Sequence, residues 1–247
     1  MKKENRKFEV TSFGLHIMAM LFMLCDHIWA TLFLSERWLT CIGRISFPIF
    51  AFLIVEGFYH TSDLKKYLKR LFIFAIISEI PFDLMYSGIP FDLFHQNVLW
   101  TFIIGLIGIS IIDKIKKKDN LVKTIFVSII VVIIYSLLGI ICMTDFFGFG
   151  VLMIFVFYFF HERKWWSYIG QLLAMYYINV ELAGGFYYPV NILGFNVEIV
   201  EQGIAILSLI PIWLYHGKQG YHEKWFKYFC YSFYPLHLLI LALLQRI

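Results

Sequence analysis

The chain has 247 residues, of which 60% are hydrophobic and only 15% are charged. Soluble domains carry roughly 25% charged residues, and the mean hydropathy of +0.75 is far more apolar, so the composition excludes a soluble globular protein and indicates an integral membrane protein. The net charge of +4 comes from basic residues grouped in particular loops. It therefore indicates orientation in the membrane and not nucleic-acid binding.

Apolar stretches of membrane-spanning length recur along the whole chain. About 20 such residues cross a hydrocarbon core of about 30 Å as a helix. The pattern predicts an all-α, polytopic bundle of about nine transmembrane helices that forms a single domain over residues 1–247. The sixth stretch is short and the eighth contains Pro211, so a merged pair or a re-entrant segment is the alternative there. The predicted helices cover residues 13–34, 39–60, 69–87, 97–113, 121–142, 147–161, 165–184, 197–215 and 228–245.

The connecting segments alternate between many and few basic residues. The N-terminus and the connections after the second, fourth, sixth and eighth stretches hold 18 of the 21 Lys and Arg residues. The other connections contribute only Arg37. Because basic residues accumulate in cytoplasmic loops, the pattern predicts that the N-terminus lies inside and the C-terminus outside, with the lipid bilayer around the bundle.

Ionisable and polar side chains interrupt several of the predicted helices. A charge at mid-membrane costs about 2.5–3.5 kcal/mol on insertion scales, so such residues usually face a bundle interior, a partner or a water-filled cavity. With the predicted orientation, several of them share one depth in the outer half of the membrane, which predicts a polar chamber open to the outer side. The residues at this depth are Asp26, His27, Arg44, Asp83 and Asn97.

Each of these side chains also has a structural interpretation. A structural ion pair or a snorkelling interfacial group is the alternative for Arg44, Glu56 and Asp83. A hydrogen-bonded interior histidine is the favoured interpretation of His237, and Tyr234 is most simply an aromatic packing residue.

Asp26 and His27 are harder to explain as structural residues. Neighbouring helix positions point about 100° apart, so the two need partners from other helices. An imidazole held by a carboxylate is what a general base requires, which favours catalysis or proton handling for this pair. The four cysteines form no CxxC pair and no metal-ligand spacing, so we expect no metal site.

Five stretches of the sequence resemble the TraX family. They are "GLHIMAMLFMLCDHIWATLF", "IGRISFPIFAFLIVEGFYHT", "KKYLKRLFIFAIISEIPFDL", "NVLWTFIIGL" and "SFYPLHLLIL", and they cover the chain from about residue 13 to 105 and again near 230 to 243. The family is named for the protein that N-acetylates F-pilin in the bacterial inner membrane, and it is similar to acyltransferase-3 and heparan-glucosaminide acetyltransferase enzymes. Residue 16 is His where the family's first helix is expected to carry Lys, and residues 110–225 match no motif.

The resemblance implies a membrane acyltransferase in the cytoplasmic (inner) membrane of a bacterium. It would take an acetyl or short acyl group from cytoplasmic acyl-CoA to an amine or hydroxyl of a peptide, sugar or small molecule, such as the N-terminus of a pilin-like peptide. On the matching positions, His27 would be the catalytic base, oriented by Asp26 or Asp83, and Arg44 would bind the acyl or acceptor group or stabilise charge. The residues expected to line the substrate site are Glu56, Glu79, Asp83, Asn97, Tyr234 and His237.

Acetyl-CoA or another acyl-CoA is then a donor substrate, and no permanently bound cofactor is expected. Its phosphates would meet the basic cluster formed by Lys65, Lys66, Lys69 and Arg70, although membrane topology alone also explains those residues. Two other classes of protein remain open. A proton-coupled transporter would also need buried ionisable residues, and a non-catalytic assembly subunit would tolerate the loss of His27.

Overall fold

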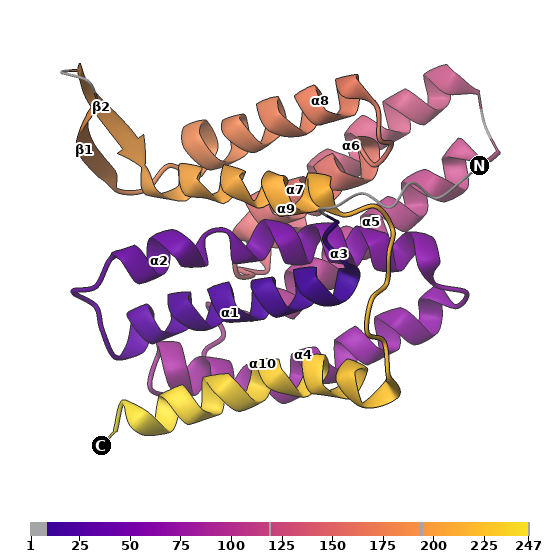
Figure 1. Cartoon of the computed structure of the whole chain (residues 1–247). Helices are drawn as coiled ribbons and strands as arrows, with labels where there is room; N and C mark the ends of the chain where they lie inside the picture. Colours follow the sequence, from indigo (N-terminus) through magenta and orange to yellow (C-terminus); the bar gives the residue numbers. More distant parts are fainter. Residues whose placement is uncertain (1–8, 119, 193–194, 247) are drawn as a thin grey trace.

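The computed structural model describes residues 9–118, 120–192 and 195–246. These residues form a bundle of helices that run side by side, with one β-hairpin at one end (Figure 1). The helices in chain order are α1 (Ser12–Thr31), α2 (Trp38–Gly43), α3 (Ser46–His60), α4 (Leu64–Tyr86), α5 (Val98–Lys116), α6 (Leu121–Ile141), α7 (Phe147–Phe159), α8 (Trp165–Tyr176), its π-helical extension η1 (Tyr177–Leu182), the 3-10 helix η2 (Glu201–Ser208), α9 (Leu209–Leu214) and α10 (Lys224–Leu244). The hairpin strands are β1 (Tyr187–Ile192) and β2 (Phe195–Val200).

Four of the long helices begin at a polar side chain that accepts a hydrogen bond from a backbone N–H of the first turn. These caps are Thr11 for α1, Asp63 for α4, Asn97 for α5 and Asn120 for α6. Each cap satisfies an N–H group that has no partner within the helix. Asp63 starts α4 more than a turn before the predicted boundary, so the basic residues at 65–70 lie in the first turns of a helix.

The predicted second span is a bent helix made of α2 and α3. The two pieces meet at Arg44 and Ile45, which form a turn. Pro48 has no backbone N–H, so it cannot bond the carbonyl of Arg44 one turn earlier. The bend places the Arg44 side chain at the junction of two helices that would otherwise be continuous.

The predicted eighth span is wrong at its start. Residues 197–200 belong to β2, which pairs antiparallel with β1 in the register Tyr187↔Val200. Polar Asn196 and Glu198 alternate with apolar residues, and this two-residue period favours a strand over a helix. Residues 201–214 are helical but too short to meet the length of a full span.

Among the described residues, five helices are long and apolar enough to cross a membrane: Ser12–Thr31, Trp38–His60, Val98–Lys116, Leu121–Ile141 and Trp225–Leu244. The chain is therefore a helical membrane protein with several candidate spans, and the count of nine stays a prediction.

Helix α3 lies at the centre of the bundle and α6 at its edge. In the span that contains α3, 67% of the residues of the apolar window are buried, against 17% in α6. An apolar helix with an exposed face is what lipid contact requires. Because α3 is central, its side chains reach both ends of the protein interior.

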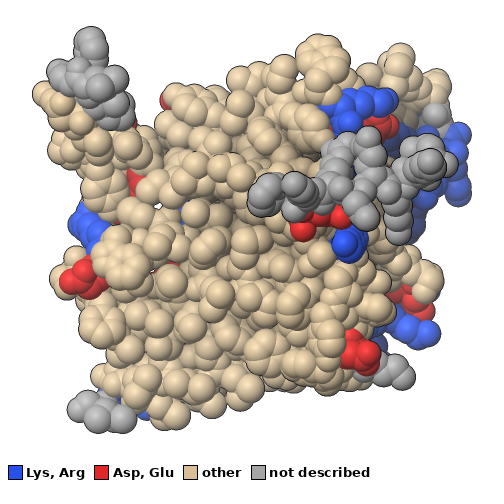
Figure 2. Space-filling view, in the orientation of Figure 1, with Lys and Arg blue, Asp and Glu red and all other residues tan. Residues whose placement is uncertain are grey.

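The basic connections gather at one end of the bundle. Helices α3, α5 and α7 finish at this end, whereas the α1–α2 and α4–α5 connections, the β-hairpin and the end of α10 lie at the other (Figure 1). Figure 2 shows most of the visible Lys and Arg side chains toward the first end. This arrangement agrees with the predicted alternation, although Lys2, Lys3, Arg6 and Lys7 lie outside the described residues. The side of the membrane that each end faces stays a prediction.

Candidate functional site

A small cavity of about 80 Å³ lies at the end of the bundle opposite the basic connections. We call it the Asp26 pocket. Six helices, α1 to α5 and α10, contribute to its wall, together with the α6–α7 connection. Four of the predicted site residues line it: Asp26, His27, Arg44 and Tyr234. Its other lining residues are Met23, Gly43, Ser46, Phe47, Phe50, Tyr86, Val98, Asp145 and Phe146.

Arg44 lies between two carboxylates in the Asp26 pocket. Its Nη2 donates to Oε1 of Glu201 at 3.1 Å, and its Nη1 lies 4.0 Å from Oδ2 of Asp26. The carboxylates have further donors, because Thr40 Oγ1 donates to Asp26 at 2.7 Å and the Tyr188 hydroxyl donates to Glu201 at 2.5 Å. Charges removed from water need such partners. The network fixes the guanidinium beside the cavity.

Close contact between α1 and α2 holds Asp26 in this position. A Cβ atom on Gly43 would lie 2.3 Å from Cβ of Asp26. Only glycine allows the two helices to approach this closely, because real Cβ contacts are longer than 3.0 Å. Gly43 therefore lets Asp26 on α1 lie close to Arg44, the residue that follows Gly43.

His27 is bonded to His237, and the geometry defines which ring nitrogens carry protons. Nδ1 of His237 lies 2.7 Å from the carbonyl oxygen of Phe233, so this nitrogen must be the donor. With neutral rings, Nε2 of His237 is then an acceptor. It lies 2.7 Å from Nδ1 of His27, which must donate to it. Nε2 of His27 therefore keeps an unprotonated lone pair, on a ring that is 6% exposed and lines the pocket. The predicted orienting groups for His27, Asp26 and Asp83, do not take this role.

The hydroxyl of Tyr234 has no hydrogen-bond partner among the described residues, although it is buried at the pocket wall. A buried O–H group without a partner is uncommon and costs free energy. It is available to donate to a group bound in the cavity.

Glu79 and Asn97 form a separate cluster. The Asn97 amide donates to the Ala75 carbonyl at 2.9 Å and to the Glu79 carboxylate, and Asn97 Oδ1 caps α5. Trp100 Nε1 donates to Glu79 at 2.8 Å. These contacts join α4 to the start of α5, and neither residue lines the Asp26 pocket.

Asp83 also bonds elsewhere. Its Oδ2 accepts from the backbone N–H of Asp92 at 2.9 Å, and its side chain is buried beside the α4–α5 connection. It supports that connection, and no hydrogen bond joins Asp83 to His27. The predicted common depth is thus compatible with the structure, but the predicted chamber includes fewer of these residues than expected.

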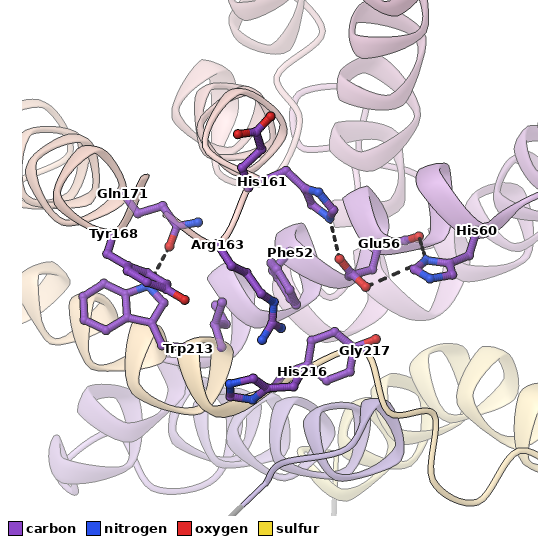
Figure 3. A pocket seen from close by; sticks show the side chains of 13 residues that line it. Phe52, Glu56, His60, His161, Arg163, Tyr168, Gln171, Trp213, His216 and Gly217 are labelled. Atoms are coloured by element: carbon purple, nitrogen blue, oxygen red, sulfur yellow. Dashed lines mark hydrogen bonds and ion pairs between the residues drawn. The ribbon is translucent and has the colours of Figure 1, made fainter. Parts of the chain in front are cut away.

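Glu56 lies at the opposite end of α3. Its Oε1 is 2.6 Å from Nε2 of His161, and its Oε2 is 3.8 Å from Nδ1 of His60. These side chains border a second cavity of about 180 Å³, drawn in Figure 3. We call it the His161 pocket. Glu56 therefore does not share a site with Asp26.

The predicted acyl-CoA cluster lines neither cavity. Lys66 pairs with Asp63 at 3.3 Å, and the Arg70 guanidinium lies 5.7 Å from the centre of the Tyr67 ring. Lys65 and Lys69 are exposed. These positions suit a solvated helix start.

Sequence reasoning did not assign Glu201, Tyr188 or Asp145 to the site. Asp145 lies in the α6–α7 connection, where Phe146 has a left-handed φ of 61°, a conformation that is strained for an aromatic residue. The Asp145 carboxylate, 3.8 Å from Nε2 of His95, raises the pKa of that histidine in the α4–α5 connection. Within the described part of the chain, no group of three or more His, Cys, Asp and Glu side chains is placed to hold a metal ion.

The family described as "TraX protein" matches residues 14–245 of this sequence. The chain belongs to the TraX family. The match extends through residues 110–225, where motifs alone indicated nothing. A relative described as "Probable fimbrial assembly protein FimC, serogroup H1", from Dichelobacter nodosus, is 29% identical over 252 residues, which cover 96% of this chain and 97% of that protein. No solved structure matches the chain.

The TraX stretches found in the sequence form most of the Asp26 pocket. They supply Asp26 and His27 from α1, Arg44 from the bend and Tyr234 from α10. Tyr86, which also lines the pocket, lies just beyond the stretch in α4. The remainder of this TraX chain adds the Asp145 connection and, behind Arg44, Glu201. Four of the five stretches that carry the resemblance thus meet at this pocket.

Proposed function

We propose that this TraX-family chain is a membrane-embedded acyltransferase that moves an acetyl or short acyl group from acyl-CoA to an amine or hydroxyl acceptor. The observation that carries the proposal is the His27–His237 pair beside the Asp26 pocket. Its hydrogen bonds leave a lone pair on Nε2 of His27. A positioned imidazole of this kind is the usual general base.

The transfer requires one base and donors for a developing oxyanion. Nε2 of His27 takes a proton from the acceptor while the acceptor nitrogen or oxygen forms a bond to the thioester carbonyl carbon. The carbonyl oxygen becomes negatively charged, and the Tyr234 hydroxyl and the Arg44 guanidinium are donors in the same pocket. The carbon–sulfur bond then breaks, and the leaving thiolate takes the proton from His27. The products are the acylated acceptor and free CoA.

Asp26 and Glu201 act through Arg44 in this scheme. Two carboxylates hold one guanidinium, so Arg44 is fixed before substrate binds, and fixed donors act more strongly on developing charge than mobile ones. Asp26 is thus a positioning residue for Arg44 and not the partner of His27.

The acceptor that fits best is the N-terminal amine of a pilin-like peptide. Support comes from the TraX family and from the relative's description as a fimbrial assembly protein. The Asp26 pocket lies at the end that the charge pattern predicts to face outward from a bacterial inner membrane, where a membrane-inserted subunit would present its terminus.

A proton-coupled transporter is the second candidate. One observation favours it: polar cavities lie toward opposite ends of the same central helix, as a substrate path would require. A transporter would have no need to cleave a thioester.

Release of free CoA thiol from acetyl-CoA by the detergent-purified chain separates the two candidates. We expect turnover by the wild type and its loss in His27→Ala. His16→Ala is the matched control, because His16 lies on the same helix and its one hydrogen bond within the described residues is to the Ser12 carbonyl, at 2.8 Å. Equal rates in wild type and His27→Ala contradict the proposal. No release by the wild type, together with substrate flux driven by a pH gradient in liposomes, establishes the transporter instead.

A further inference from the structure

The His161 pocket lies at the end of the bundle that carries the basic connections. It is bounded by the end of α3, the α7–α8 connection, α8 and the segment that leaves α9 (Figure 3). The positive-inside pattern predicts that this end faces the cytoplasm. A ligand that enters here would come from the cytoplasmic solution.

The acidic groups at this pocket are already paired. Both oxygens of Glu56 face histidines, His161 at 2.6 Å and His60 at 3.8 Å. The exposed Glu162 lies 2.6 Å from Lys164. Neither carboxylate is therefore left to repel an anion at full strength.

Arg163 is the cation of the pocket that lacks a carboxylate. Among the described residues, no Asp or Glu oxygen lies within 4.0 Å of it, and its guanidinium instead sits 5.9 Å from the centre of the Tyr215 ring. Figure 3 shows its guanidinium directed into the space between Phe52 and His216. Arg163 is an exposed residue of the cavity wall. A guanidinium that pairs with no carboxylate of the described residues is suited to a phosphate group.

The opposite wall is aromatic and rigid. Trp213 Nε1 donates to the Gln171 side chain at 2.6 Å, and the Gln171 amide donates to the Phe160 carbonyl at 2.9 Å. The Tyr168 ring packs against Trp213 at 5.4 Å between centres. These bonds preform the wall, so little ordering is needed when a ligand binds.

The two cavities share α3. Phe50 lines the Asp26 pocket and Phe52 lines the His161 pocket, on opposite sides of the same turn of helix. A thioester donor with a phosphate-bearing nucleotide at one end and an extended arm has the chemistry that would engage both regions. With about 180 Å³, the His161 pocket is smaller than the roughly 300–1,000 Å³ of sites for whole ligands, so it would hold a phosphate group and not the entire nucleotide.

We propose that the His161 pocket binds a phosphate group of the acyl-CoA donor, with Arg163 as the binding residue. This inference rests on the proposed function for the identity of the donor. It replaces the basic cluster at residues 65–70 as the donor site.

The test measures binding of CoA to the detergent-purified full chain by calorimetry and the KM for acetyl-CoA in the thiol-release assay. Arg163→Gln should weaken CoA binding and raise KM about tenfold or more, because it removes charge-assisted hydrogen bonds, and should leave kcat within twofold. Lys65→Gln is the matched control, since it also removes one positive charge, at an exposed residue that lines neither cavity. It should change neither the CoA affinity nor the KM by more than twofold.

The outcomes separate this inference from the proposed function. If wild type and Arg163→Gln bind CoA equally, or if the wild type binds none, the inference is overturned. If anionic phosphatidylglycerol in mixed micelles competes with CoA for wild type but not for Arg163→Gln, and acetyl-CoA drives no turnover, the phosphate comes from a lipid headgroup and the donor assignment is overturned. Arg163-dependent CoA binding without thiol release would support the phosphate site and contradict the acyltransferase proposal. Thiol release with a KM unaffected by Arg163→Gln would support the acyltransferase proposal and contradict the phosphate site.

Discussion

The hydrogen bond between His27 and His237 offers the sharpest test of the proposed chemistry. Replacing His237 with Phe keeps an aromatic ring of similar shape beside Phe233, whose ring centre lies 4.7 Å away, but removes the acceptor for Nδ1 of His27. A buried N–H without a partner costs about 1–3 kcal/mol. His27 can avoid this penalty by carrying its proton on Nε2, the atom that we propose acts as the base. The base would then lack its lone pair.

The size of the effect follows from the role of the base. General acid–base catalysis contributes about 10²–10⁴-fold, and holding a catalytic histidine in the wrong tautomer costs roughly 10⁴-fold in serine proteases. We therefore expect His237→Phe to lower kcat for CoA release by about 10²–10⁴-fold, with little change in the KM for acetyl-CoA. His237→Gln should recover part of the rate, because its amide oxygen can accept from Nδ1 of His27.

Three measurements complete this test. Thiol release gives kcat and KM for each variant, and thermal unfolding identifies any variant that is misfolded. Nitrogen-15 resonances of labelled histidine report directly which ring nitrogen of His27 carries the proton. His16→Phe is the control for a histidine lost from the same bundle. A folded His237→Phe protein with wild-type kcat, or a proton on Nε2 of His27 in the wild type, refutes the reasoning.

Three further changes test the surroundings of the site. Gly43→Ala should destabilise the protein by about 1–3 kcal/mol through overpacking, because the new Cβ would lie 2.3 Å from that of Asp26; an unchanged thermal midpoint would show that α1 and α2 separate freely. Glu201→Gln should also lower the midpoint and reduce kcat, since breaking a buried ion pair costs about 3–5 kcal/mol and Arg44 would keep only the 4.0 Å contact with Asp26; retention of both values would mean that Glu201 does not hold Arg44. The raised pKa of His95 means that its pairing with Asp145 stabilises the fold fully below its ordinary value of 6.5 and progressively less as pH rises through the folded pKa. His95→Ala should therefore lower the thermal midpoint more at pH 5.5 than at pH 8. The free energy of unfolding lost with this partly exposed pair should be at most about 1 kcal/mol, and an equal loss at both pH values would contradict the assignment.

The apolar pattern predicted the helices well where a stretch is uniform. The predicted 121–142 is Leu121–Ile141 in the structure, and the predicted 13–34 is Ser12–Thr31. The apolar pattern failed where the spacing of apolar residues changes within one predicted helix. The helix predicted from residue 197 begins as strand β2. The period of two in residues 196–200 was visible in the sequence but was averaged into the apolar residues that follow.

The partners of the buried polar residues were less accessible to sequence reasoning. Orientation and helix rise give a depth for each side chain, and the predicted depth grouped Asp26, His27 and Arg44, which line one pocket in the structure. Depth does not give the rotation of one helix against another. The bond between His27 and His237 joins residues 210 apart in the chain, and that between Arg44 and Glu201 joins residues 157 apart, so neither follows from a local pattern.

Glu56 shows how the two kinds of sequence argument can disagree. The family resemblance placed it in one site with Arg44, whereas the predicted orientation left Glu56 out of the group of outer-half residues that contains Arg44. Twelve residues of helix separate them, which corresponds to about 18 Å at 1.5 Å per residue, too far for two side chains to line one cavity of about 80 Å³. The structure agrees with the helix geometry, because Glu56 pairs with His161 at the other end. A single central helix therefore borders the proposed general-base site at one end and the proposed phosphate-binding pocket at the other, which is the separation that a donor and an acceptor arriving from opposite sides of a membrane would require.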